Sequence, residues 1–230
     1  MKEWKPRPDQ PERLDQQTAF YESRLPGVAV LIGGYGSGKA TVSMRKAVEF
    51  ILRGPMPINS PLVFRFVLPG NNAPHKRRMV EFLLRSCTHA ITHGAGEGVV
   101  RLFGYRPDGL PYRVLIGPAN INTVRGIELD GFAILGAVDR DFMDAMLSMS
   151  RQPKPGAMSI AFYPEVPEIT SHITDRIDDG TLPDGWGVFR TNTECAVESG
   201  HVSREWYDAF IGAENQRRKT GDWSNGDDDR

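Results

Sequence analysis

The chain has 230 residues, 40% of them hydrophobic and 25% charged, and carries a formal net charge of −1 at pH 7. This length can bury a sizeable core in one substantial domain or two small ones. The near-neutral charge excludes a general polyanion binder, so any contact with DNA must depend on local patches. The two cysteines, Cys87 and Cys195, cannot form a metal cage alone, and nothing marks a disulfide framework, which favours reduced thiols.

Targeting and membrane segments are not evident. No apolar run approaches the ~20 residues of a membrane span, and the N-terminus lacks the apolar core of a signal peptide. We therefore expect a soluble, cytoplasmic protein. Residues 1–15 are polar and rich in proline and predict an extended arm. Residues 16–223 predict the folded domain, and residues 224–230 a polar tail.

The hydrophobic pattern predicts strands that alternate with helices. Between two of the strands, Arg106-Pro107-Asp108-Gly109 is typical of a hairpin turn. Alternation of this kind predicts an α/β domain with a largely parallel sheet, flanked by helices and extended by this hairpin. The predicted helices span residues 15–23, 42–51, 74–93, 140–150 and 204–218. The predicted strands span residues 28–32, 62–68, 99–105, 110–117, 132–135, 158–164 and 185–192.

Residues 28–41, VAVLIGGYGSGKAT, join a predicted buried strand to a helix through a glycine-rich loop. The pattern G-x-x-x-x-G-K-[ST] is met by Gly33, Gly38 and Lys39. Glycines let backbone N–H groups turn inward around phosphate oxygens, and the lysine would reach the β- and γ-phosphates. The alternative is an ordinary glycine-rich turn. The predicted phosphate-binding residues are Gly33, Gly34, Tyr35, Gly36, Ser37, Gly38, Lys39, Ala40 and Thr41.

The last position of this pattern departs from the rule. It should carry a hydroxyl that holds Mg²⁺, but it is Ala40. Thr41 follows, and on a helix its side chain points about 100° away from that of residue 40. The loop therefore predicts nucleotide phosphates more clearly than it predicts metal-assisted hydrolysis.

The order of the motifs resembles the N-terminal ATPase domain of the terminase large subunit, the motor that packages DNA into tailed-phage heads. Gln17 and Phe20 resemble the Q-x-x-F signal of these motors, and GGYGSGK resembles their GGxGSGK loop. Further similar features are the 106–109 hairpin, TVRGIELDGFAIL before the acidic strand, MSIAFYPEVPEITSH at the coupling motif, and the ending at Gly221–Trp223. The resemblance covers nearly all of the chain and implies a P-loop NTPase-like fold.

The same resemblance implies a ligand and partners. The ligand would be ATP, with Gln17 and Phe20 at its adenine. The partners would be double-stranded DNA, other packaging subunits (small terminase, portal, a separate nuclease) and further copies of this chain. The location would then be the host cytoplasm. No later carboxylate cluster could hold nuclease metals, so we expect either that the nuclease is a separate polypeptide or that this chain is a stand-alone paralogue.

The family's acidic pair is missing from the expected place. The acidic strand should end in Asp-Glu, which hold Mg²⁺ and polarise the attacking water. Depending on register, this pair falls on Leu135-Gly136 or on Gly136-Ala137. Asp139 is the remaining catalytic candidate, although Arg140 would then stand at the base position.

The coupling segment is altered as well, because Ala161-Phe162-Tyr163 stand where hydroxyl residues are expected. Together with Ala40 and the missing acidic pair, this predicts a domain that binds ATP, holds Mg²⁺ poorly and hydrolyses slowly or not at all. Two alternatives stay open: an unrelated P-loop small-molecule kinase, and a non-catalytic structural or regulatory subunit of a packaging or other phage complex.

Other polar clusters allow ordinary explanations. His75–Arg78 could contact a phosphate backbone or reach a neighbouring subunit's nucleotide, but they also fit the solvated first turn of a helix. His89 and His93, at i, i+4 on the predicted helix, could share a metal, although no third ligand is evident. The aspartates of residues 175–179 indicate loop and cap positions.

Overall fold

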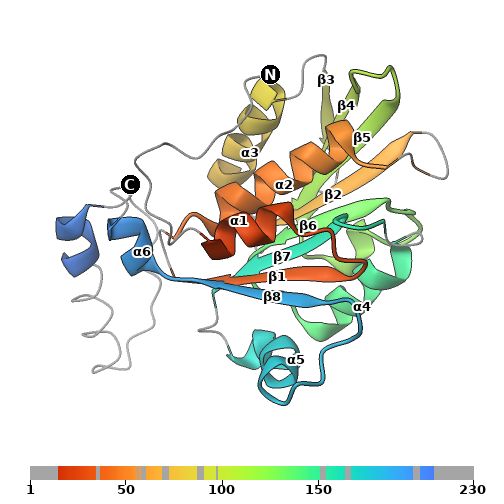
Figure 1. Cartoon of the computed structure of the whole chain (residues 1–230). Helices are drawn as coiled ribbons and strands as arrows, with labels where there is room; N and C mark the ends of the chain where they lie inside the picture. Colours follow the sequence, from red (N-terminus) through yellow and green to blue (C-terminus); the bar gives the residue numbers. More distant parts are fainter. Residues whose placement is uncertain are drawn as a thin grey trace.

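The computed structural model describes residues 15–34, 37–55, 57, 61–68, 73–86, 91–96, 98–150, 154–163, 167–198 and 203–209. The described residues form an eight-stranded sheet with the order β3-β4-β5-β2-β6-β7-β1-β8 (Figure 1). The strands are β1 Val28–Gly33, β2 Leu62–Leu68, β3 Ile91–Gly96, β4 Val99–Tyr105, β5 Pro111–Pro118, β6 Gly131–Leu135, β7 Met158–Phe162 and β8 Gly187–Thr191. The labelled helices are α1 Asp15–Glu22, α2 Lys39–Arg53, α3 Ala73–Ser86, α4 Arg140–Met149, α5 Pro167–Asp178 and α6 Thr193–Glu198, with a 3-10 turn at Ile121–Thr123. Residues 204–209 are also helical, within the helix predicted over 204–218.

The strands from β5 to β8 along this order run parallel. β3 and β4 extend the sheet in antiparallel fashion beyond β5, and Gly109 takes a φ of 84° in the hairpin turn between β4 and β5. The sequence-based prediction of an α/β domain with a largely parallel sheet and an added hairpin is therefore confirmed. The expected N-terminal arm, the polar tail and the Gly221–Trp223 ending lie outside the described residues.

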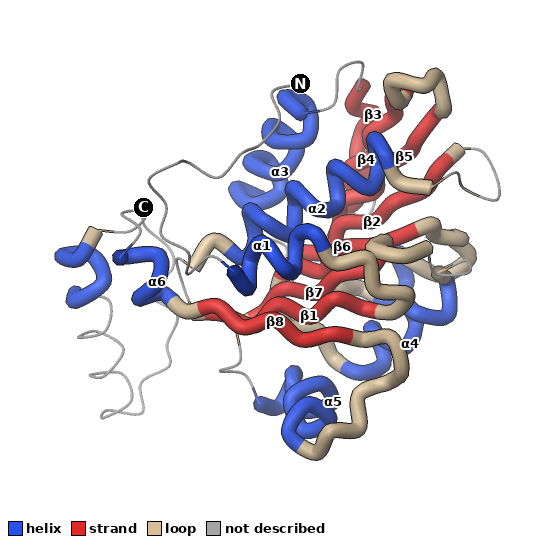
Figure 2. Tube along the Cα trace, in the orientation of Figure 1, coloured by secondary structure: helices blue, strands red, loops and turns tan. Residues whose placement is uncertain are grey.

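Helices cover both faces of the sheet. α1, α2 and α3 lie on one side, and α4 and α5 lie on the other (Figures 1 and 2). Because both faces are covered, the central strands are continuous apolar runs, and every residue of β1 and β2 is buried. Even Arg65 of β2 is fully buried. Its Nη atoms donate to the carbonyl oxygen and to Oγ1 of Thr123, at 2.9 and 2.7 Å, which fastens the segment before β6 to the sheet.

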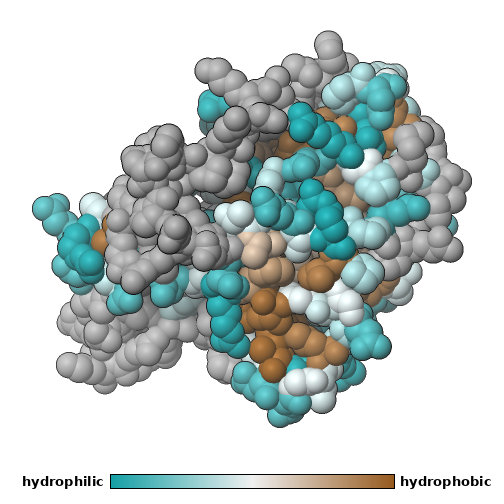
Figure 3. Space-filling view, viewed as in Figure 1, coloured by the Kyte–Doolittle hydropathy of each residue, from teal (hydrophilic) through white to brown (hydrophobic). Residues whose placement is uncertain are grey.

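β8 forms one edge of the sheet. Its Phe189 ring meets the ring of Phe20 edge-on, with centroids 5.7 Å apart, so α1 packs against this edge. Trp186 and Val188 are partly buried and pack against the main core. Figure 3 shows apolar side chains at the surface on the side of the molecule where β8 lies.

Two sequence-based predictions were wrong, the second only in part. The helix expected over residues 74–93 ends at Ser86, and residues 91–96 form β3, which pairs with β4. His93 therefore lies in a strand, and no helix brings it beside His89, which lies outside the described residues. The positions predicted for the aspartates of residues 175–179 are only partly wrong: Asp175 lies within α5, whereas Asp178 is its last residue and Asp179 lies in the turn that follows. Within the described part of the chain, no helix is long and apolar enough to cross a membrane.

Candidate functional site

The glycine-rich loop lies at the carboxyl edge of the parallel sheet. β1 runs between β7 and β8 and ends at Gly33, and α2 begins at Lys39. Gly38 precedes α2 with a φ of 78° and no side-chain cap, a conformation that L side chains rarely adopt. Ligands of open α/β sheets bind at this edge, and the free N–H groups of a helix N-terminus favour anions. Tyr35 and Gly36 lie outside the described residues.

The first two glycines of the loop are packed against the end of β8 and the segment that follows it. A Cβ atom on Gly33 would lie 2.5 Å from Cγ2 of Thr191, and one on Gly34 would overlap Oγ1 of Thr193. Side chains are therefore excluded at both positions. The backbone of the loop is held close to residues 191–193, which sequence reasoning did not connect with the site.

Lys39 is largely buried beside the loop. Its Nζ donates to the carbonyl oxygen of Gly34 at 2.8 Å and lies 5.9 Å from the ring centroid of Tyr163, which follows β7. Burial lowers the pKa of Lys39 from 10.5 to about 8, because removal from water disfavours the ammonium form. An anion bound in the loop would favour the charged form again.

Gln17 of α1 reaches the loop from outside. Its Nε2 donates to the carbonyl oxygen of Ser37 and, at 3.2 Å, to Oγ1 of Thr191. Phe20, one helical turn further, has no exposed surface. The expectation that Phe20 contacts adenine therefore does not fit, because its ring belongs to the core between α1 and β8.

The pairing of the strands shows which residues lie beside the loop, at the place where the acidic pair was expected. Ala161 of β7 pairs with Leu31 of β1 and with Leu135 of β6. Leu135 is therefore level with Leu31, and Gly136 follows at the level of the last residues of β1. Gly136 has a φ of 140°, in the region where non-glycine residues are strained. Neither Leu135, Gly136 nor Ala137 carries an oxygen on its side chain.

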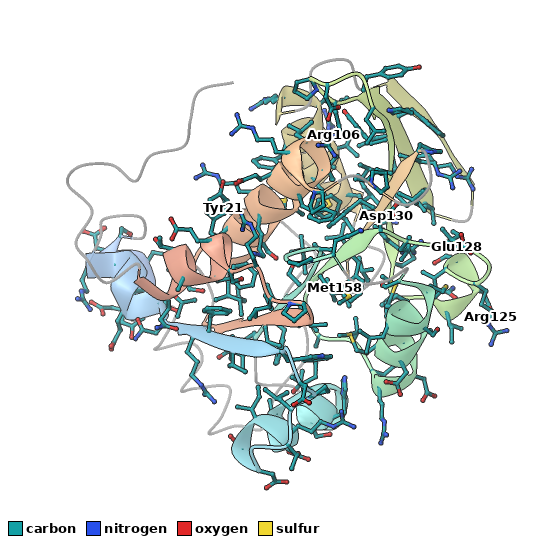
Figure 4. The ribbon with its side chains drawn as sticks, turned by 45° about the vertical axis from the view of Figure 1, so that its right-hand side comes forward. Tyr21, Arg106, Arg125, Glu128, Asp130 and Met158 are labelled. Carbon is teal, nitrogen blue, oxygen red and sulfur yellow. The ribbon has the colours of Figure 1, made fainter. Side chains whose placement is uncertain are left out.

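The neighbouring aspartates have other roles in this structure. Oδ1 of Asp139 accepts a hydrogen bond from the N–H of Phe142 at 2.7 Å and caps α4. Asp130 is buried at the opposite end of β6 (Figure 4) and accepts from the N–H of Val63 at 2.7 Å. At about 3.3 Å per residue, Asp130 lies about 20 Å along the strand from Gly136. It cannot replace a carboxylate beside the loop.

The position expected to carry the metal-binding hydroxyl offers no ligand to a Mg²⁺ ion. Oxygen ligands are required, but Ala40 has none, and its neighbour Thr41 is exposed on the next helical position. Among the residues that the structure describes, no group of three or more His, Cys, Asp or Glu side chains could hold a metal ion. The observed site therefore consists of the loop backbone, Ser37, Lys39 and Gln17.

A residue that sequence reasoning missed is Lys46 of α2. Its side chain is only 3% exposed. The helical period would have shown it, because Lys46 lies four residues from both Val42 and Phe50 and so falls on the apolar face of α2. A lysine on such a face is rarely buried without polar partners.

The strand–loop–helix unit at the carboxyl edge of a largely parallel sheet defines a P-loop NTPase-like fold. Neither a protein-family model nor a curated protein matches the sequence. The structure is similar to that of the large terminase from a thermophilic bacteriophage in complex with ADP, with a TM-score of 0.53, 10% sequence identity, and coverage of 85% of this chain and 48% of that chain.

A second solved structure, the HK97 bacteriophage large terminase, matches with a TM-score of 0.48 and 13% identity over 77% of this chain and 38% of that one. The chain therefore spans about half the length of the thermophilic phage protein and less than half the length of the HK97 protein. The similarity to the ADP-bound structure confirms a terminase-like fold.

Proposed function

We propose that this chain is a terminase-like nucleotide-binding domain that binds ATP through Gly33–Lys39 and hydrolyses it slowly or not at all. The observation that carries the proposal is the loop itself. It follows a buried central strand, it ends in a left-handed Gly38, and it brings Lys39 back against its own backbone. The thermophilic phage terminase, which has the same fold, was solved in complex with ADP, and this supports a nucleotide as the ligand.

Slow hydrolysis is supported by what stands beside the loop. Ala40 replaces the metal-binding hydroxyl, Gly136 lies at the end of the strand expected to carry the acidic pair, and Asp139 caps a helix. Two contributions to phosphoryl transfer, metal binding and orientation of the attacking water, therefore lack side chains at the expected positions. Binding itself depends mainly on backbone N–H groups and Lys39.

Two measurements test the proposal. In a calorimetric titration with ATP, the wild-type protein is expected to bind and Lys39→Ala to lose most of the affinity. Lys154→Ala, which removes a lysine before β7 at the end of the parallel strands opposite the loop, is the matched control and should bind like the wild type. If the wild-type protein binds no ATP at millimolar concentration, the proposal fails and a non-catalytic structural or regulatory subunit becomes the better explanation.

The second measurement is a steady-state ATPase assay with and without DNA. We expect turnover far below about 1 s⁻¹, the lower end of ordinary rates for phosphoryl-transfer enzymes. Turnover at or above that rate would contradict impaired hydrolysis while leaving nucleotide binding intact. Transfer of phosphate from ATP to a small molecule would favour the kinase alternative.

Double-stranded DNA and other packaging subunits are the partners that we propose, by analogy with the fold. The distribution of charge along the chain supports DNA as a partner. Residues 61–118, which include α3 and the β3–β5 extension, hold eight Lys and Arg but three Asp and Glu, a net charge of +5. Since the whole chain carries −1, the remainder carries −6. Arg77, Arg78, Arg85 and Arg101 of this part are exposed.

A further inference from the structure

α1 is attached to α2 at the end that is remote from the loop. Tyr21 Oη of α1 donates to Oε2 of Glu49 of α2, and Nη2 of Arg24 pairs with Oε1 of the same carboxylate at 3.4 Å. Tyr21 is labelled in Figure 4 where α1 faces α2. Burial and the contact with Glu49 raise the pKa of Tyr21 to about 12, so the phenol donates throughout the ordinary pH range.

Lys46 completes this attachment from the buried side. Its Nζ donates to the carbonyl oxygens of Tyr21 and Ser23 at 3.2 and 2.5 Å, and to Oγ of Ser23 at 3.1 Å. It also lies 5.6 Å from the ring centroid of Phe20. The ammonium group therefore contacts Tyr21 in the last turn of α1 and Ser23 directly after it, where the carbonyl groups of a helix lack intrahelical partners. A cation at the C-terminal end of a helix also interacts favourably with the helix dipole, whose negative end lies there.

An alternative explanation for these cations is an anion site. A cavity of about 200 Å³ opens beside them and is lined by Arg24, Lys46, Glu49 and Arg53. The cavity lies where the C-terminal ends of α1 and α2 meet, and both helix ends favour cations without any ligand. The hydrogen bonds of Lys46 are made to the protein, so the contacts favour attachment of α1 over ligand binding.

The opposite end of α1 carries Gln17, which holds the carbonyl oxygen of Ser37. A peptide unit is planar and trans, so its C=O and N–H groups point in opposite directions. When Gln17 fixes the carbonyl of Ser37, it also fixes the direction of the N–H of Gly38. That N–H belongs to the loop whose backbone would contact phosphates.

We propose that Lys46 and Glu49 are positioning residues, which fasten the C-terminal end of α1 to α2 and thereby hold Gln17 against the phosphate loop. Docking of α1 and nucleotide binding are then thermodynamically coupled. This inference rests on the proposed nucleotide binding. It adds a regulatory consequence, because any change that releases α1 from α2 weakens ATP binding without touching the loop.

The test is a double-mutant cycle on ATP affinity. Lys46→Met should weaken binding roughly fivefold or more, within the usual range of coupling between sites. In a Gln17→Ala background, Lys46→Met should have no further effect, because its action passes through Gln17. Glu49→Met, which keeps the side-chain length but removes both acceptor oxygens, should behave in the same way and serves if Lys46→Met fails to fold. Arg53→Met, which removes a cation from the last turn of α2 without changing these hydrogen bonds to α1, is the matched control and should bind like the wild type.

A second readout does not require nucleotide. Amide hydrogen exchange should become faster in residues 37–43 as well as in α1, both in Lys46→Met and in Gln17→Ala. Equal losses of affinity for Lys46→Met in both backgrounds, or faster exchange in α1 alone, would overturn the positioning role. If the wild-type protein binds no ATP, the proposed function fails, whereas the exchange experiment still decides whether Lys46 positions the loop.

Discussion

At the scale of single residues, Lys39 determines how the site should respond to pH. Burial lowers its pKa to about 8, and bound phosphates would raise it again because a nearby anion favours the ammonium form. ATP affinity should therefore be full below pH 8 and should fall as the pH rises through about 8. Titrations between pH 7.5 and 9.5, where little of the ATP γ-phosphate is still protonated, measure this.

Lys39→Arg is the control for that profile, because arginine stays charged over the whole range. Its ATP affinity should be independent of pH. A wild-type affinity that does not change up to pH 9.5 would contradict the prediction. An equal decline in Lys39→Arg would assign the effect to Lys46, whose pKa burial also lowers to about 8.

Ala40 decides the role of Mg²⁺. Position 40 is exposed in the first turn of α2, so a larger side chain meets no obstacle there. We expect ATP binding by the wild type to be nearly independent of Mg²⁺, and Ala40→Thr to gain about fivefold in affinity when Mg²⁺ is added, which corresponds to about 1 kcal/mol. Ala40→Val has the same shape without the hydroxyl and should gain nothing. Strong Mg²⁺ dependence of the wild type would show that another ligand holds the metal.

At the scale of elements, Asp139 belongs to α4 more than to the site. Because its carboxylate caps the helix through the N–H of Phe142, Asp139→Ala should lower the free energy of unfolding by about 1 kcal/mol, as measured in urea. Asp139→Asn keeps a capping oxygen and should be nearly neutral. Both variants should bind ATP like the wild type. A loss of ATP turnover in Asp139→Asn, with stability retained, would instead make this carboxylate catalytic.

The elements that could be predicted from sequence are those whose signals are local. The apolar run Val28–Ile32 before a glycine-rich loop fixes β1, and Asp108-Gly109 fixes the hairpin. β3 could not be predicted in this way, because Gly94 and Gly96 give no strand pattern and the segment is ordered by pairing with β4. α5 was missed although its isoleucines recur every four residues, since its β-branched residues lower helix propensity.

The site was only partly predictable, because some of its contacts are local in sequence and others join distant segments. The sequence shows the loop and the lack of an acidic pair, and strand pairing then brings Gly136 level with the end of β1. The contacts of Gln17 with Ser37 and of Lys46 with α1 join segments that are 20 and about 25 residues apart. Such contacts depend on how α1 packs, which no local pattern contains.

At the scale of the whole molecule, charge is unevenly distributed. The part of the chain from 61 to 118 carries a net charge of +5, in a protein whose total is −1. Its exposed arginines lie on α3 and β4, whereas the nucleotide loop lies between β1 and α2 in the other part of the sheet. A polyanion would therefore be attracted to the β3–β5 extension and repelled by the rest of the surface.

This polarity predicts where DNA contacts the protein. Arg78→Glu and Arg101→Glu should each weaken binding to a double-stranded oligonucleotide, measured by fluorescence anisotropy. Each should also lower the salt dependence of the affinity by about one counterion for every phosphate that the arginine no longer neutralises. Arg176→Glu, on α5, makes the same charge change in the acidic part and is the control. If only the total charge of the protein mattered, which is −1 in the wild type, all three substitutions would weaken DNA binding equally. If DNA contacts this part of the surface, Arg78→Glu and Arg101→Glu should weaken binding and Arg176→Glu should not. Equal effects of the three substitutions would remove the basis for assigning DNA to this extension.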